Sequence, residues 1–268
     1  MRIEVVTLFP DMIRQALGFG VLGRAIERGL VRVGTEDPRA HTRDAHRTVD
    51  DRPYGGGPGM VLKPEPMAAA IDAAAARAPR GAPRVYLSAQ GERLGQSLVA
   101  EFAACDGLVL VAGRYEGLDE RVIASRIDRE VSLGDFVLSG GEVPALALID
   151  AVARLLPGVL GDERSSVEDS FSDGLLDWPH YTRPVVFEGQ VVPEVLQQGH
   201  HADIRRWRLK QAVARTWRRR PDLIAGGGLS REASALLNEF LEEERHGQHH
   251  SADRTEPHDA QGPGVSPR

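Results

Sequence analysis

Short apolar runs alternate with helix-like segments over roughly the first 155 residues of this 268-residue chain. The apolar runs predict strands at 3–8, 31–33, 85–87, 108–111 and 136–138. The segments between and after them predict helices at 10–17, 21–28, 65–77, 96–104, 119–125 and 142–155. Strands that alternate with helices form a mostly parallel α/β sheet, and this alternation restricts the fold class more than any other feature.

Three apolar runs pass into glycine-bearing turns, in the segments VYLSAQGERL, LVLVAGRYEGLDERV and VSLGDFVLSGGEVPALALID. Ligands of open α/β sheets bind beyond the carboxyl ends of the strands. The junctions at Gly91, Gly113 and 134–141 therefore predict one shared pocket lined by backbone amides and carbonyls. The helix that starts at Glu142 would add N–H groups and the positive end of its dipole.

The composition limits the classes of protein to which the chain can belong. With 41% hydrophobic and 27% charged residues, it can bury one good-sized core and a second small one. No run approaches the ~18 apolar residues of a membrane span, and the N-terminus lacks the build of a signal peptide. We therefore expect a soluble cytoplasmic protein without a membrane partner. The single cysteine, Cys105, excludes an internal disulfide and a cysteine-based zinc site.

The segment HRTVDDRPYGGGPGM, residues 46–60, is too rich in glycine and proline to form a regular element. It is either a mobile surface loop or a loop that folds over a ligand or RNA. It is not a Walker A motif, because no Gly-Lys-Ser/Thr follows, and it is not a GxGxxG that opens a helix. ATP and NAD therefore lose support as ligands.

The C-terminal part of the chain differs in composition from the α/β part. The segment 162–177 is acidic and serine-rich and predicts a flexible linker or a lid. Helical patterns at 202–219 and 230–245 predict a small helical domain over 178–245, after an α/β domain over 1–161. Residues 246–268 contain four histidines but are polar throughout, which favours a disordered tail over a metal site.

The segment RRWRLKQAVARTWRRR, residues 205–220, holds eight basic residues and no acidic one. The net charge of −6 argues against a nucleic-acid partner, but a local patch matters more than the sum. Because surface salt bridges explain an acid-free run poorly, the segment predicts a polyanion-binding helix. Trp207 and Trp217 within it are either core anchors or base-stacking platforms.

Seven blocks of sequence resemble, in this order, the bacterial tRNA (guanine-N1)-methyltransferases of the SPOUT class, the TrmD family: DRPYGGGPGM, YLSAQG, LVAGRYEGLDERV, SLGDFVLSGGE, EDSF, GLLDWPHYTRP and ADIRRWRLKQ. The likeness runs from Met1 to about Phe240. It implies a SPOUT-type, mostly parallel sheet with a C-terminal trefoil knot, in which the chain threads through a loop, plus a small α-helical second domain. Ala89, Leu133 and Phe136 depart from the proline, isoleucine and tyrosine that are frequent in the family.

The resemblance also implies a cofactor and partners. Family members methylate N1 of the guanosine immediately 3′ of the tRNA anticodon when another guanosine precedes it, and magnesium dependence is associated with them. They are obligate homodimers whose active sites join both subunits. The knot loops bind S-adenosylmethionine in a bent form, and the matching positions here are Tyr86, Leu87, Ser88, Gly113, Tyr115, Ser132, Leu133, Gly134, Phe136, Leu138, Gly140, Gly141 and Pro144.

Three residues match catalytic groups of the family. Guanine N1 carries a proton, so methyl transfer needs a general base, and Asp169 matches the proposed one. Arg154 matches an arginine that would stabilise negative charge at the guanine O6, and Glu116 would help to hold the guanine or the cofactor. Without the resemblance, Asp169 would be an ordinary linker acid and Arg154 a complement to a helix dipole. Glu116 would pair on the surface with Arg114 or Arg121.

Contacts to the RNA backbone are expected from basic residues of the second domain: Arg205, Arg206, Arg208, Lys210 and Arg215. The chain is therefore predicted to methylate tRNA with S-adenosylmethionine. One alternative is a non-catalytic tRNA-binding module of the same fold, and the joint presence of Glu116, Arg154 and Asp169 argues against it. The other is an unrelated Rossmann-type dinucleotide enzyme, which the missing GxGxxG disfavours.

Overall fold

The structure is a computed structural model that describes residues 1–161 and 168–252. The chain divides into two compact units, Met1–Ser166 and Val167–Arg268. Within the described residues, no helix is long and apolar enough to span a membrane. Each unit is described by itself below.

The first unit is built on a five-stranded parallel sheet with the strand order β2-β1-β6-β5-β7. The strands are β1 (Arg2–Val6), β2 (Arg32–Glu36), β5 (Arg84–Arg93), β6 (Gly107–Ala112) and β7 (Arg129–Ser132). Every residue of the central strand β6 is buried, as expected for a strand that is covered on both faces. The predicted mostly parallel α/β sheet is confirmed.

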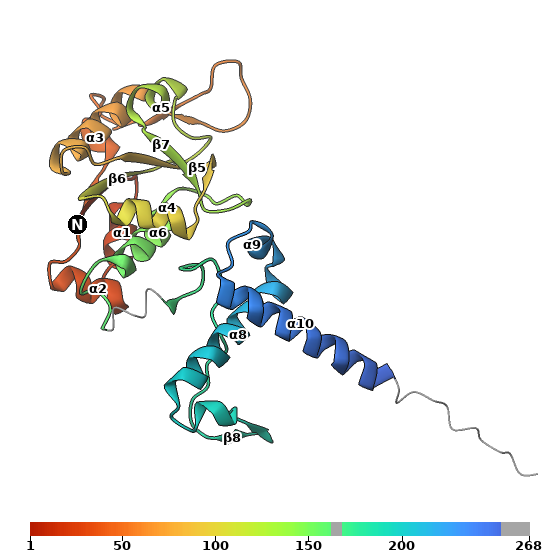
Figure 1. Cartoon of the computed structure of the whole chain (residues 1–268). Coiled ribbons are helices and arrows are strands. Elements are labelled where there is room, and N and C mark those ends of the chain that lie inside the picture. The colour runs from red at the N-terminus through yellow and green to blue at the C-terminus, as the bar shows by residue number, and fades with distance from the viewer. Residues whose placement is uncertain (162–167, 253–268) are drawn as a thin grey trace, which may run out of the picture. The chain divides into compact units, whose positions relative to one another are not determined.

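Helices cover both faces of this sheet (Figure 1). One face carries α1 (Pro10–Ala16), α2 (Gly20–Glu27), α4 (Gln96–Ala103) and α6 (Glu142–Leu155). The other carries α3 (Pro64–Arg77) and α5 (Glu120–Arg126). Along β6 the side chains alternate between the two cores, because Leu108 and Leu110 join the first and Val109 and Val111 the second.

The strand predicted at 136–138 is wrong. The fifth strand is β7, which the sequence analysis missed because Val131 is its only apolar residue. After β7 the chain turns: Ser132 Oγ donates to Gly134 O at 3.1 Å, and Phe136 N donates to the same carbonyl at 2.9 Å. The apolar side chains at 136–138 are exposed in this turn and pair with no strand.

Two short strands, β3 (Asp50–Asp51) and β4 (Val61–Leu62), form an antiparallel pair on either side of the glycine-rich segment. The one-turn 3-10 helix η1 (Pro38–His41) leads toward them from β2. The glycine-rich segment is therefore the tip of a hairpin with a fixed base.

The second unit packs α8 (His201–Arg219) against α10 (Arg231–Ala252), with the short helix α9 (Pro221–Ala225) between them. It also holds a hairpin of β8 (Val186–Phe187) and β9 (Gln190–Val191), and the 3-10 helix η2 (Glu194–Leu196). Its core joins α8 and α10 to Leu175, a residue of the predicted linker. Helix α10 continues past residue 245, where the tail was predicted to begin, and residues 162–167 and 253–268 lie outside the described residues.

Candidate cofactor site and nucleic-acid interface

A cavity of about 400 Å³ lies at the carboxyl ends of β5, β6 and β7. Its size is typical of a small-molecule site. The lining comes chiefly from the segments 86–90, 113–118, 130–134 and 136–141. Every residue expected to bind the cofactor lines this cavity: Tyr86, Leu87, Ser88, Gly113, Tyr115, Ser132, Leu133, Gly134, Phe136, Leu138, Gly140, Gly141 and Pro144. Glu116 lines it as well.

Glycine allows the walls of the cavity to approach one another. Gly141 N donates to Gly113 O at 2.9 Å, and a Cβ on Gly141 would lie 2.7 Å from the Cα of Ala112. A Cβ on Gly113 would lie 2.8 Å from the ring of Tyr86. The turn after β7 is thereby fixed against the end of β6, and the two glycine turns form one wall as the sequence predicted.

Tyr86, a residue of the strand β5, lines the cavity with its phenol side chain. Its side chain is buried, and burial raises the pKa of the phenol. A hydrogen bond with the Leu118 backbone opposes this rise, and the charges of Glu130 and Glu120 add to it. Tyr86 therefore stays protonated and can act as a hydrogen-bond donor at the floor of the cavity.

The turn that carries Glu116 is clasped by the glycine-rich hairpin. Glu116 N donates to Met60 O at 2.9 Å, and Leu62 N donates to Gly117 O at 2.9 Å. Gly59 packs so closely on Glu116 that any Cβ would overlap its carboxylate. The base of the hairpin is thus bound to the turn of Glu116, whereas Tyr54 at its tip is fully exposed and no residue of 46–60 lines the cavity. Whether this loop folds over a ligand or RNA stays a prediction.

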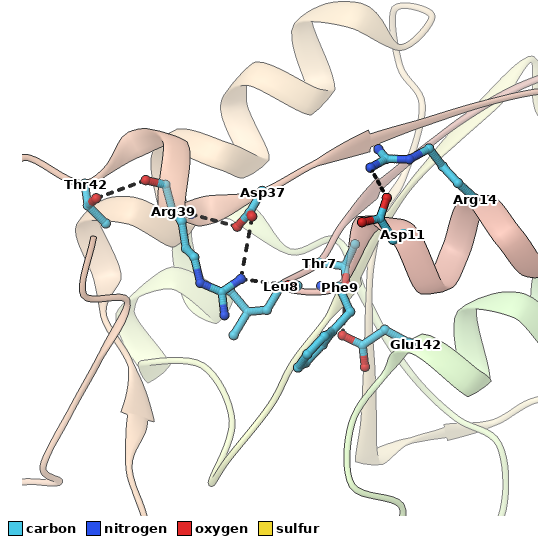
Figure 2. A network of polar contacts seen from close by, with 9 residues as sticks. All are labelled: Thr7, Leu8, Phe9, Asp11, Arg14, Asp37, Arg39, Thr42 and Glu142. Atoms are coloured by element: carbon cyan, nitrogen blue, oxygen red, sulfur yellow. Dashed lines mark hydrogen bonds and ion pairs between the residues drawn. The ribbon is translucent and has the colours of Figure 1, made fainter. Parts of the chain in front are cut away.

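A buried ionic group joins the cavity wall to β1. Thr7 Oγ1 donates to Glu142 Oε1 at 2.8 Å, while Phe9 N donates to Thr7 Oγ1 (Figure 2). Arg114 Nε lies 2.9 Å from Glu142 Oε2, and the two side chains form an ion pair. The N–H of Arg114 does not point at the carboxylate oxygen well enough to form a hydrogen bond. Arg114 Nη1 also donates to Ser139 O at 3.1 Å, in the turn that lines the cavity.

This group was not found from the sequence, because Thr7 and Glu142 are 135 positions apart. It also removes one competing explanation of Glu116. Arg114 pairs with Glu142 and Arg121 pairs with Asp119, so neither arginine serves as the surface partner of Glu116 among the described contacts. Glu116 is left as a carboxylate on the cavity wall.

The other two predicted catalytic residues do not line the cavity. Arg154 lies in the last turn of α6, half-buried. Asp169 belongs to the second unit, where Ser172 N donates to its backbone carbonyl at 3.2 Å. Of the three predicted catalytic groups, Glu116 lines the cavity together with the predicted cofactor residues, Arg154 lies elsewhere in the first unit, and Asp169 belongs to the second unit.

The basic helix α8 is less free than its sequence suggested, because α10 supplies acidic partners. Arg205 pairs with Glu232 at 2.8 Å, and Arg206 pairs with Glu239. Lys210 lies 2.8 Å from Glu239 and 2.6 Å from Glu243. Salt bridges therefore explain part of this basic run, contrary to the expectation from sequence, because acidic residues of α10 that are distant in sequence supply the partners.

Ionisation follows this pairing. Burial alone would lower the pKa of Lys210, but hydrogen bonds to Glu239 and Glu243 raise it. Hydrogen bonds from Lys210 and Arg206 lower the pKa of Glu239. These side chains are therefore charged and engaged with each other at neutral pH.

The remaining RNA candidates on α8 lie in other surroundings. Arg208 packs over the ring of Trp178 at 4.8 Å, with Glu168 4.0 Å away. Arg215 forms no ion pair with any residue that the structure describes, and the same holds for Arg219. Separations of seven and four positions place Arg208, Arg215 and Arg219 along one side of the helix.

The tryptophans of α8 differ in exposure. Trp207 is half-buried, with the ring of Tyr181 tilted against it at 6.3 Å between centroids. Trp217 is 41% exposed. Trp207 is therefore in the surroundings of a core anchor, whereas the exposed part of Trp217 is available for stacking. Both roles stay predictions.

Comparison with known proteins assigns the chain to a family. The model of the family described as tRNA (Guanine-1)-methyltransferase TrmD matches residues 1–226. A tRNA (guanine-N(1)-)-methyltransferase of Salmonella schwarzengrund is 57% identical over 249 residues, covering 93% of this chain and 98% of the relative. One from Cronobacter sakazakii is 57% identical over 249 residues, covering 93% and 97%. The chain therefore belongs to the TrmD family of tRNA (guanine-1)-methyltransferases.

Proposed function

We propose that this protein transfers a methyl group from S-adenosylmethionine to N1 of the guanosine immediately 3′ of the tRNA anticodon, where another guanosine precedes it. The observation that carries the proposal is the cavity, since all the cofactor positions matched by sequence gather around it at the ends of three adjacent strands. Family membership and the names of the relatives support the same reaction. Nothing in the described structure favours a non-catalytic module.

The cavity fits the proposed cofactor. Its glycines allow the lining segments to pack closely, because a Cβ on Gly113, Gly140 or Gly141 would overlap a neighbouring segment. Leu87, Leu133 and Leu138 add apolar surface for a flat base. The proposal includes a trefoil knot at these turns, and the close contact of Gly141 with the end of β6 supports it. When bound, S-adenosylmethionine supplies a methyl group on a sulfonium, which leaves as a thioether.

In the proposed reaction, the side chains of the protein remove a proton from guanine and stabilise the negative charge that this leaves on the base. Asp169 accepts the N1 proton of guanine, so that the ring nitrogen regains a lone pair for the methyl group. Arg154 stabilises the negative charge that this step pushes onto O6. Glu116, on the cavity wall, orients the guanine or the cofactor. Asp169 ends the step protonated and passes the proton to solvent.

The proposal extends to the assembly. Two copies form each active site, with Asp169 supplied by the partner subunit, and α8 with its basic residues holds the tRNA backbone. The magnesium dependence that the resemblance implies is given no site in this scheme. It acts either on the protein or through the RNA.

The test uses the purified protein, methyl-labelled S-adenosylmethionine and two unmodified tRNAs. The first carries two consecutive guanosines at the target site, and the second carries adenosine in place of the target guanosine. We expect label in the first tRNA only, at guanine N1. Binding of both tRNAs without methyl transfer would instead identify a tRNA-binding module.

A further inference from the structure

We propose that Thr216 of α8 is a positioning residue, which holds the Asp169-bearing segment in place for proton removal. The inference rests on the proposed function, because it concerns the general base of that reaction. It is carried by one buried hydroxyl that joins this segment to the basic helix. All the residues involved belong to the second unit.

The hydroxyl of Thr216 has a fixed direction. The side chain is fully buried, and Oγ1 donates to Ala212 O at 2.7 Å, one helical turn earlier. A hydroxyl has one proton, so this bond leaves Oγ1 only lone pairs for other partners. Leu176 N donates to one of these at 2.8 Å. The helix thus presents a preset acceptor to a backbone amide of the segment.

The residues next to the bond between Leu176 and Thr216 form a loop that is held by its own hydrogen bonds. Phe171 N donates to Leu175 O at 2.7 Å, and Asp177 N donates to Ser170 Oγ at 3.0 Å. Leu175 is buried in the core that α8 shares with α10. Asp169 stands directly before this closed loop, so the position of its backbone depends on where Leu175 and Leu176 are held.

One residue of the loop needs such restraint. Phe171 has a φ of +73°, in the left-handed region that side chains other than glycine rarely adopt. Such a conformation persists only where the surrounding contacts determine it. Loss of the bond to Thr216 would leave the half-buried Leu176 N–H without its partner and release the loop toward other backbone conformations.

The expected consequence is a loss of alignment, with binding retained. A general base must lie within hydrogen-bond reach of its proton, and a displacement of about 1 Å in such geometry costs about a hundredfold in rate. The cofactor cavity is lined only by residues of the first unit, so its affinity does not depend on Thr216. Thr216 would therefore act on turnover and leave cofactor binding unchanged.

The experiment compares Thr216→Val, Thr216→Ser and the wild-type chain. Valine keeps the shape of the buried side chain and removes the acceptor, while serine keeps the acceptor. Single-turnover methylation is measured at saturating tRNA and cofactor, together with cofactor affinity and amide exchange of the peptide 170–178. We expect Thr216→Val to lower the rate about tenfold or more, the value of one net hydrogen bond, to speed exchange of that peptide and to leave the cofactor dissociation constant unchanged. Thr216→Ser should restore the rate and the slow amide exchange of the wild-type chain.

A control variant separates the loss of the hydrogen bond between Thr216 and Leu176, which tethers the loop, from a general loss of packing in the core of the second unit. Val213→Ala removes packing from the same fully buried helix face but keeps the hydroxyl, so it should lower the unfolding free energy without slowing single turnover by the folded protein. A Thr216→Val rate within twofold of wild type, or a Thr216→Ser rate as low as that of valine, would overturn the inference. Inactive wild-type protein would refute the proposed methyl transfer instead, and unchanged amide exchange in Thr216→Val would still refute the tether.

Discussion

Asp169 is the residue on which the proposed proton transfer depends. Asp169→Asn removes the basic oxygen while it preserves size, so the single-turnover rate should fall by about 10²–10⁴, the usual contribution of a general base. Cofactor affinity should stay unchanged, because the cavity is lined by other residues. Asp173→Asn is the matched control on the same segment, since its side-chain oxygen can still accept from Leu175 N. Near-normal turnover in Asp169→Asn would assign proton removal to another group.

Glu142 is the buried charge that fixes the cavity wall. Glu142→Gln keeps an oxygen for Thr7 but leaves Arg114 without its counter-ion, which for a buried pair costs about 3 kcal/mol of unfolding free energy. We expect weaker cofactor binding as well, because Arg114 also holds Ser139 in the lining turn. Denaturant unfolding and calorimetric titration with S-adenosylmethionine measure the two effects.

A second carboxylate provides the comparison for this prediction. Asp135→Asn breaks the pair of Asp135 with Arg93, in which both side chains are largely exposed, and should change the unfolding free energy little. Equal effects of Glu142→Gln and Asp135→Asn would show that burial of the Glu142 pair has no special role.

The sequence predicted the residues of the cavity better than it predicted what holds them. Glycine turns after apolar runs are local signals, and the cavity formed at two of the three predicted junctions, Gly113 and 134–141. Gly91 was wrong, because it lies within β5 against the backbone of Glu130 and does not line the cavity. Thr7, Glu142 and Thr216 carry no local signal, because a threonine or a glutamate of this kind is defined only by partners far along the chain. Such residues are identified once the fold has brought the partners together.

At the scale of elements, the glycine-rich hairpin should act on catalysis through Gly59. Gly59→Ala places a Cβ on the Glu116 carboxylate and should displace it, with a fall in turnover. Gly55→Ala is a close control: its φ of +84° matches the +86° of Gly59, but a Cβ there meets nothing within 4 Å. Both variants place an alanine at a positive φ of nearly the same size, so a difference in single-turnover rate reports the contact with Glu116.

The basic helix allows a similar paired test. Arg215→Gln with Arg219→Gln removes two cations without ion pairs among the described residues, whereas Arg206→Gln with Lys210→Gln removes two that α10 already engages. If α8 binds tRNA phosphates, the first pair should weaken binding more and flatten the salt dependence by up to about two charges. Binding titrations at several salt concentrations measure this slope. A larger effect of the second pair would place the RNA on the side of α8 that faces α10.

Elements with strong periodicity were predicted well, and those without it were not. β6 and α6 are apolar enough to be recognised alone. β7 has one buried valine among polar residues, and its strand conformation comes from pairing with β5, as Val131 lies beside Leu87. The neighbouring apolar run at 136–138 was mistaken for the strand, although its side chains line the cavity.

For the whole molecule, the division into two units separates the proposed cofactor site from the proposed general base. Both large cores and every residue that lines the cavity lie before the end of the first unit. The third core, with Leu175 and the facing helices α8 and α10, is formed within the second unit. The sequence analysis assigned residues 162–177 to a flexible linker or lid. In the described part of that segment, 168–177, Leu175 packs in the core of the second unit and Leu176 N donates to Thr216 of α8.

This separation makes a prediction about a fragment. Residues 1–161 alone should fold and bind S-adenosylmethionine with an affinity within a few fold of the full chain, because the fragment contains the complete cavity lining and both of its supporting cores. It should not methylate tRNA, since Asp169 and α8 are missing. Full-length Asp169→Asn is the control, expected to match the fragment in cofactor affinity and to exceed it in tRNA binding. Circular dichroism establishes folding and calorimetry the affinity; a folded fragment that fails to bind the cofactor would show that residues of the second unit complete the cofactor site.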